Sequence, residues 1–171
     1  MFNPVKLSGI AAATLFLTAC ASTPELTSDQ ISNIEVEVAD YGLYELGKLN
    51  EIGDKDYIAG SSLEAESLSH TKTTDSLDAQ VGVTFGANFN ISGLPTEKKM
   101  TFREVMIFPE MTDPQTGGKQ SYYETTAKYH NNLTKFKGFT FEYDWELVKG
   151  DWTYQIYYQD TLLAEQTFIV N

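Results

Sequence analysis

The chain has 171 residues and a net charge of −12 at pH 7, with 24 acidic residues against 12 Lys and Arg. This acidic balance disfavours binding to nucleic acid or to a flat anionic lipid surface, because either requires clustered Lys and Arg. A single cysteine excludes an internal disulfide framework, so the core of one domain must stabilise the fold, for which about 150 residues are enough.

The first residues contain the three parts of a secretory signal. Lys6 supplies a positive charge, Leu7 to Leu17 form an apolar run, and Thr18 and Ala19 are small residues before Cys20. The run of about a dozen residues is shorter than the ~20 that a transmembrane helix needs. We therefore expect cleavage rather than a permanent membrane span.

Leu17-Thr18-Ala19-Cys20 resembles the lipobox of bacterial lipoproteins. The resemblance implies a diacylglyceryl group on the Cys20 sulfur, cleavage after Ala19 and a further acyl chain such as palmitate on the freed amine. Two or more chains anchor a protein stably at a membrane. Ala21, rather than an aspartate, follows the cysteine, so analogy with Gram-negative sorting predicts the periplasmic face of the outer membrane. The alternative is an ordinary signal peptide that ends at a lone cysteine.

The remainder divides into a tether and one domain. Residues 20–31 are mostly Ala, Ser, Thr, Pro and Glu, which predicts a flexible tether. The expected organisation is therefore a signal peptide over 1–19, a tether over 20–31 and a folded domain over 32–171.

Alternation of apolar and polar residues predicts strands in the first half of this domain. Ile34 to Val38 alternates strictly, Gly47 to Gly60 is a polar loop with three glycines, and Ser62 to Thr73 is an exposed or edge strand. The clearest strand runs from Val81 to Ile91, where apolar residues recur at every second position. Gly93-Leu94-Pro95 ends it.

The second half continues the same pattern. Met100 to Phe108 predicts a largely buried strand that ends at Pro109, and Asp113 to Gly118 has the composition of a turn. Further strands are expected at Gln120 to His130, Phe136 to Tyr143, Trp152 to Tyr158 and Leu162 to Val170, the last two joined as a hairpin by Gln159-Asp160-Thr161.

Roughly seven to nine short strands without extended helical periodicity predict an all-β fold, an immunoglobulin-like antiparallel β-sandwich. A small closed barrel is the alternative, because alternation alone does not distinguish the two architectures.

The domain also contains Asp40-Tyr41-Gly42-Leu43-Tyr44, Phe85-Gly86, Gly93-Leu94-Pro95, Asp113-Pro114 with Thr116-Gly117, and the block from Trp145 to Phe168. In these motifs, over about Ile34 to Val170, it resembles the bacterial family known as domain of unknown function 3859. The resemblance implies an uncharacterised envelope domain with a sandwich-like fold and without established catalytic residues. Within the last block, Gly150-x-Trp152-x-Tyr154 is explained by a turn glycine followed by inward aromatic anchors.

The sequence offers no catalytic, cofactor-binding or metal-binding constellation. His70 and His130 lack the spacing of a zinc pair, and Asp54 and Asp56 lack the other ligands of an EF-hand loop. We interpret the histidines as exposed or hydrogen-bonded, and the aspartates as part of a solvated acidic loop. We therefore expect no enzyme, no cofactor and no metal.

Aromatic residues are the one compositional excess. Adjacent side chains on a strand face opposite sides, so one member of Tyr122-Tyr123 and one of Tyr157-Tyr158 should face solvent. Exposed Tyr122 and Tyr157 are candidate ligand-binding aromatics for a sugar or a protein partner. The alternative is cross-strand aromatic pairs that stiffen a sandwich without disulfides.

These observations favour a non-enzymatic, lipid-anchored cell-envelope module that binds an envelope protein or a glycan. A carbohydrate- or peptidoglycan-binding β-sandwich is the alternative, based on the exposed aromatics. An enzyme is the least supported of the three classes.

Overall fold

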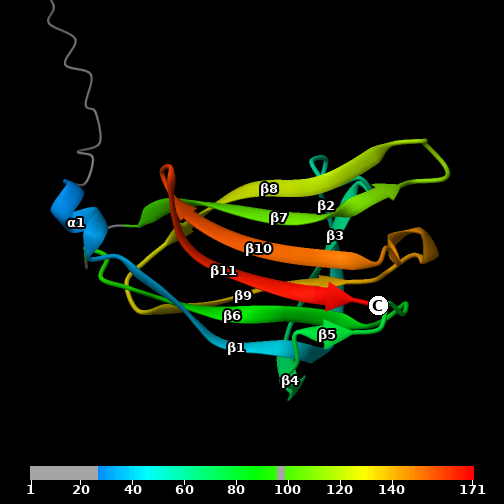
Figure 1. Ribbon diagram of the computed structural model, residues 1–171, viewed down its shortest axis with the longest axis horizontal. Helices are drawn as coiled ribbons and strands as arrows, with labels where there is room; N and C mark the ends of the chain where they lie inside the picture. The colour runs from blue at the N-terminus through cyan, green and yellow to red at the C-terminus, as the bar shows by residue number, and fades with distance from the viewer. Residues whose placement is uncertain (1–26, 96–98) are drawn as a thin grey trace, which may run out of the picture.

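In the computed structural model, which describes residues 27–95 and 99–171, the chain folds into two packed β-sheets (Figure 1). In chain order the elements are α1 (Ser28–Ser32), β1 (Glu35–Leu46), β2 (Leu49–Gly53), β3 (Ser61–Ala65), β4 (Leu68–Lys72), β5 (Ser76–Leu77), β6 (Thr84–Ser92), β7 (Met100–Thr112), β8 (Lys119–Tyr129), β9 (Leu133–Thr140), the 3₁₀ turn η1 (Asp144–Glu146), β10 (Gly150–Tyr158) and β11 (Thr161–Val170). The predicted all-β sandwich is confirmed.

One sheet has the strand order β4-β1-β6-β9 and the other β5-β11-β10-β7-β8, while β2 and β3 form a separate hairpin. The pairs are antiparallel except for β5 with β11. The two sheets contact each other at β1 and β11. β9 is the edge strand farthest from β4 in the first sheet, and β8 is the edge strand farthest from β5 in the second. The β2–β3 hairpin runs across the sandwich strands in Figure 1.

Aromatic side chains fill the space between the sheets, because alternation turns every second residue of each strand inward. Trp152 is fully buried, and its indole nitrogen donates to the carbonyl oxygen of Val148 at 3.2 Å. Its ring lies 4.8 to 5.6 Å, between centroids, from those of Phe85, Phe108, Phe139 and Phe141. Tyr154 is buried beside it, so the prediction of inward aromatic anchors after Gly150 is confirmed.

The prediction of a polar loop from Gly47 to Gly60 is wrong in part, because β2 lies within it. All five residues of β2 are exposed, so the strand has no buried face that could produce alternation. The single strand predicted from Ser62 to Thr73 is two strands, of which β3 pairs with β2 and β4 pairs with β1. The described residues thus contain eleven strands rather than seven to nine.

The strand predicted to end at Pro109 continues to Thr112. The register of β7 against β8 shifts between Ile107 and Met111, and in such an irregular stretch the missing N–H of a proline breaks no ladder hydrogen bond. The predicted turn follows, with the backbone N–H of Asp113 donating to the carbonyl of Gly118 at 2.9 Å. The C-terminal hairpin of β10 and β11 is confirmed.

Most of the predicted tether, residues 20–26, lies outside the described residues. Ser28–Ser32 forms α1, at one end of the sandwich in Figure 1. Thr27 and Gln30 form a capping box: the Thr27 hydroxyl accepts from the Gln30 N–H at 3.3 Å, and the Gln30 side chain accepts from the Thr27 N–H at 3.0 Å. The cap fixes where the helix begins.

Candidate functional site

Tyr122 and Tyr157 lie on the same outer face of the five-stranded sheet but do not form one cluster. Tyr122 is 60% exposed and pairs across strands with Ile107, whereas Tyr157 is half-buried and pairs with Arg103. The Arg103 guanidinium lies 3.9 Å from the centre of the Tyr157 ring and covers one side of it. From the strand spacing and rise, the two tyrosines are about 16 Å apart. A single sugar ring cannot stack on both.

Their neighbours on the chain face the other way, as the alternation predicted. Tyr158 is buried in the core, and Tyr123 is half-buried between the sheets. Each adjacent pair therefore divides between core and surface.

The lipobox and Cys20 lie outside the described residues. Over residues 27–95 and 99–171, no helix is both long enough and apolar enough to cross a membrane.

His70 lies on β4, whereas His130 directly follows the end of β8. The His70 ring in β4 donates from Nε2 to the carbonyl oxygen of Tyr41 at 3.0 Å, and the His130 ring donates from Nδ1 to the carbonyl oxygen of Asn131 at 2.9 Å. Both histidines are exposed. Within the described part of the chain, no group of three or more His, Cys, Asp or Glu residues could hold a metal ion.

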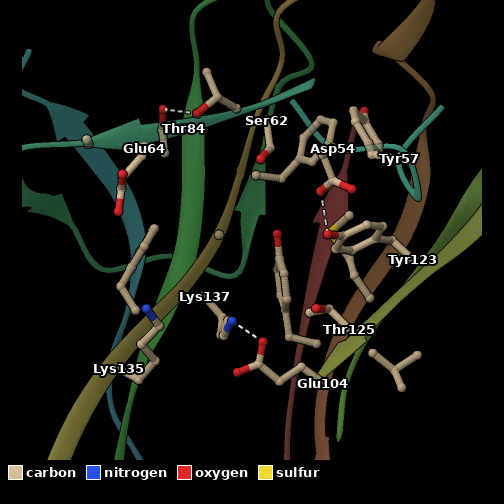
Figure 2. A pocket seen from close by; sticks show the side chains of 18 of the residues that line it. Asp54, Tyr57, Ser62, Glu64, Thr84, Glu104, Tyr123, Thr125, Lys135 and Lys137 are labelled. Carbon is tan, nitrogen blue, oxygen red and sulfur yellow. Dashed lines mark hydrogen bonds and ion pairs between the residues drawn. The ribbon is translucent and has the colours of Figure 1, made fainter. Parts of the chain in front are cut away.

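A cavity of about 390 Å³ opens where β9 faces β7 and β8, and the β2–β3 hairpin borders it. Figure 2 shows polar side chains that reach this space from four directions: Asp54 and Tyr57 follow β2, Ser62 and Glu64 lie on β3, Glu104 on β7 and Lys137 on β9. Neither histidine is among the described residues that line it. The sequence did not predict this site.

A buried ion pair crosses the cavity between the two sheets. Lys137 Nζ donates to Glu104 Oε2, and the side chains of Lys137 and Glu104 are 22% and 6% exposed (Figure 2). Burial lowers the pKa of the Lys137 ammonium, against the opposing effect of the Glu104 charge. The pair joins the sheets on the side where the cavity opens.

Two tyrosine hydroxyls tie the loop after β2 to the sandwich. Tyr123 donates to Asp54 Oδ2 at 2.6 Å, and Tyr57 donates to Glu146 Oε1 at 2.7 Å. Glu146 is 1% exposed, and its other oxygen accepts from the backbone N–H groups of residues 142 and 143 at 2.6 and 3.0 Å. Asp54, predicted to be part of a solvated acidic loop, instead holds Tyr123 at the cavity.

Three side-chain oxygens are buried without a hydrogen-bond partner in the described part of the chain: Glu104 Oε1, Tyr154 OH and Tyr129 OH. Glu104 and Tyr154, each 5% exposed, line the cavity, whereas Tyr129 is not among its lining residues. Glu104 Oε1 and Tyr154 OH are called the open oxygens below. A buried polar atom that is left unsatisfied costs about 1–3 kcal/mol, so a ligand that reaches both oxygens has a source of binding energy.

Carboxylates also set the electrostatics of the loop side of the cavity. Burial, then the hydrogen bond to Asp54, raises the pKa of Tyr123. Burial and then the charge of Glu146 raise the pKa of Tyr57 well above its usual value. Burial and the charge of Glu146 also raise the pKa of Glu142. Burial and the neighbouring carboxylates act in the same direction, so the tyrosines remain protonated donors.

The sequence contained one signal for this site. Phe102, Glu104, Met106 and Phe108 alternate, so a strand that turns the apolar residues inward also turns Glu104 inward. Its partner Lys137 stands two residues before Phe139 on β9 and shares that residue's face for the same reason. A charged residue on an otherwise apolar face is the pattern that could have identified the pair.

The comparisons with known proteins support the fold and the family. The model of the family described as "Domain of unknown function (DUF3859)" matches residues 32–170, which confirms the resemblance found in the sequence motifs. An immunoglobulin-like protein of Pseudomonas aeruginosa, PA1606, has a similar crystal structure, with a TM-score of 0.57 and 21% identity over 80% of this chain and 97% of that chain. The predicted immunoglobulin-like fold is thereby confirmed. No curated protein matches the chain.

Proposed function

We propose, given that the chain belongs to the DUF3859 family of domains of unknown function, that it is a non-enzymatic binding module of the cell envelope. In this proposal a lipid on Cys20 holds the domain at the membrane, and the inter-sheet cavity is the binding site. The observation that carries the binding function is the pair of open oxygens, which belong to two residues that line a cavity large enough for a small ligand.

The anchor is supported by the sequence of Leu17 to Cys20 and by the acidity of the domain, which itself has little affinity for anionic lipid. Cys20→Ser should abolish incorporation of a palmitate analogue and release the protein from membranes in fractionation. Ser22→Ala, two residues on, is the matched control and should change neither. Incorporation of the palmitate analogue by Cys20→Ser, together with its retention in membranes, would contradict lipidation at this residue.

The expected location is the periplasmic face of the outer membrane, because Ala21 follows the cysteine. In a host with two membranes, Ala21→Asp should move the protein from the outer to the inner membrane fraction. Identical fractionation of both forms would exclude sorting by this residue.

Binding in the cavity can be tested by ligand-observed NMR with a panel of neutral, cationic and anionic small polar compounds. Ser62 lines the cavity from β3, so Ser62→Trp should fill the opening and remove the signals of any bound compound. Ser69 is exposed on β4 and does not line the cavity, so Ser69→Trp is the control. Binding that survives Ser62→Trp would place the ligand elsewhere.

Sugar binding on the outer face is the second candidate, and the 60% exposure of Tyr122 beside the 43% exposure of Ile107 favours it. Tyr122→Ala should then abolish retention on peptidoglycan or glycan supports. Tyr157→Ala should have a smaller effect, because Arg103 already covers one side of that ring. Undiminished retention of Tyr122→Ala would exclude this face.

A further inference from the structure

The residues that carry the open oxygens are neighbours on adjacent strands. Glu104 pairs with Ile156 across β7 and β10, and Tyr154 pairs with Met106, so Glu104 and Tyr154 are diagonal neighbours on the inward face. Diagonal neighbours of this kind lie about 7–8 Å apart. One small molecule in the cavity can therefore lie next to both residues.

The two oxygens require different hydrogen-bond partners from a ligand. Glu104 already accepts from Lys137 at Oε2, so Oε1 is a carboxylate oxygen that can only accept. The Tyr154 hydroxyl can donate or accept, and burial raises its pKa, so it stays protonated. A hydrogen-bond donor is therefore required at Glu104, and a hydroxyl suits Tyr154.

The charge of the lining favours a cation at the first position. The cavity has four carboxylates, those of Asp54, Glu64, Glu104 and Glu142, against the two ammonium groups of Lys135 and Lys137. An anionic ligand would meet this excess of negative charge, and its anionic group could not donate to Glu104 Oε1. A cationic donor satisfies both conditions.

The walls between the polar groups are apolar. Met106, Phe139 and Ile156 line the cavity and are buried. An apolar carbon skeleton of a few atoms can pack against them, since small-ligand sites combine such walls with a few polar groups.

We infer that the cavity binds a small hydroxylated primary amine. Its ammonium group donates to Glu104 Oε1, a hydroxyl hydrogen-bonds with the Tyr154 hydroxyl, and its carbon atoms pack against Phe139 and Ile156. This inference rests on the proposed function of the cavity as a binding site, and it adds the class of ligand.

The test is calorimetric titration of the full-length chain in detergent with four probes. Glucosamine carries the amine and the hydroxyls, whereas glucose has a hydroxyl in place of the amine. In N-acetylglucosamine the amine is acetylated and carries no charge. Ethanolamine is a short amino alcohol like that of a lipid headgroup. A charged hydrogen bond is worth about ten- to a hundredfold in affinity, so glucosamine should bind by that factor more tightly than glucose and N-acetylglucosamine. The ratio of the affinities for glucosamine and ethanolamine shows whether the cavity prefers an amino sugar or a headgroup-like amino alcohol.

The matched variants are Tyr154→Phe and Tyr129→Phe. Each removes one buried hydroxyl that has no partner among the described residues, so both should fold, and only Tyr154 lines the cavity. Tyr154→Phe should weaken amine binding about three- to tenfold, and Tyr129→Phe should leave it unchanged.

The outcomes distinguish failure of the inferred ligand class from failure of the cavity as a binding site. Glucose or an anionic sugar acid that binds as tightly as glucosamine, with the same dependence on Tyr154, would overturn the amine and leave the cavity as a binding site. Amine binding that is equally weakened by Tyr129→Phe, or unaffected by Tyr154→Phe, would overturn the assignment of the open oxygens. Absence of binding by all probes and by the wider panel would overturn the proposed function itself.

Discussion

The ion pair between Lys137 and Glu104 should respond asymmetrically to removal of its two members. The Glu104 side chain is 6% exposed and its Oε1 is open, so Lys137→Met leaves a buried carboxylate with neither oxygen paired. Breaking a buried pair in this way costs about 3–5 kcal/mol, and we expect a value near 3 because Lys137 is partly exposed. Glu104→Leu should cost only about 1 kcal/mol, because the Lys137 ammonium, on a side chain that is 22% exposed, can turn to solvent.

The double variant Glu104→Leu/Lys137→Met replaces the pair by apolar side chains of similar length. Such replacements are often neutral or stabilising, so its free energy of unfolding should lie within about 1 kcal/mol of that of the wild type. Urea unfolding of the four proteins, followed by the fluorescence of Trp145 and the buried Trp152, gives the complete cycle. Equal losses in the two single variants, or a double variant as unstable as Lys137→Met, would refute the assignment of Glu104 as the trapped charge.

Three further changes test the fold. Gly93→Ala should destabilise the protein by more than about 2 kcal/mol in urea unfolding, because φ is +74° and a Cβ would lie 1.7 Å from the carbonyl oxygen of Asn33. Gly53→Ala is the control: its Cβ would meet nothing within 4 Å, so it should change the free energy of unfolding by less than about 0.5 kcal/mol. Glu146→Ala removes the acceptor of two backbone N–H groups and a tyrosine hydroxyl, and should cost about 3 kcal/mol or more in the same assay. Burial raises the pKa of Tyr154 above 10.0, so the unfolded chain loses this proton first, and the free energy of unfolding falls by about 1.4 kcal/mol per pH unit above pH 10. Urea unfolding at about pH 9.5 to 11 should show a shallower fall of this free energy for Tyr154→Phe than for the wild type. Identical slopes for the two proteins would exclude this cause.

The fold was predictable where strands have one buried face. In β6, Phe85, Ala87, Phe89 and Ile91 are buried in alternation, and the sequence shows that period directly. β2 was missed because all of its residues are exposed, so burial imposes no pattern on it. The strand was wrongly predicted to end at Pro109, because this proline lies where the register shifts, and that shift depends on how β7 pairs with β8.

The site was less predictable, because it depends on which strands face each other. Alternation alone places Glu104 inward, but its partner Lys137 is 33 residues away, and only the stacking of β9 over β7 brings the two together. Asp54 belongs to a polar loop whose sequence gives no sign that it holds Tyr123, 69 residues away. Tyr122 was correctly expected to be exposed, whereas the Arg103 that covers Tyr157 comes from a neighbouring strand.

The energetics of the cavity are consistent with the proposed binding role of its polar groups. A buried ion pair adds little to stability compared with apolar side chains of the same volume, and an unsatisfied buried oxygen subtracts from it. A phenylalanine in place of Tyr154, or an apolar pair in place of Glu104 and Lys137, would pack the same space without these costs, as the aromatic core around Trp152 does a few residues away. Tyr129 shows that one open hydroxyl can occur outside the cavity. Two open oxygens of different character, beside an ion pair and an excess of carboxylates in one space, are accounted for together by a ligand that supplies the missing donor and hydroxyl.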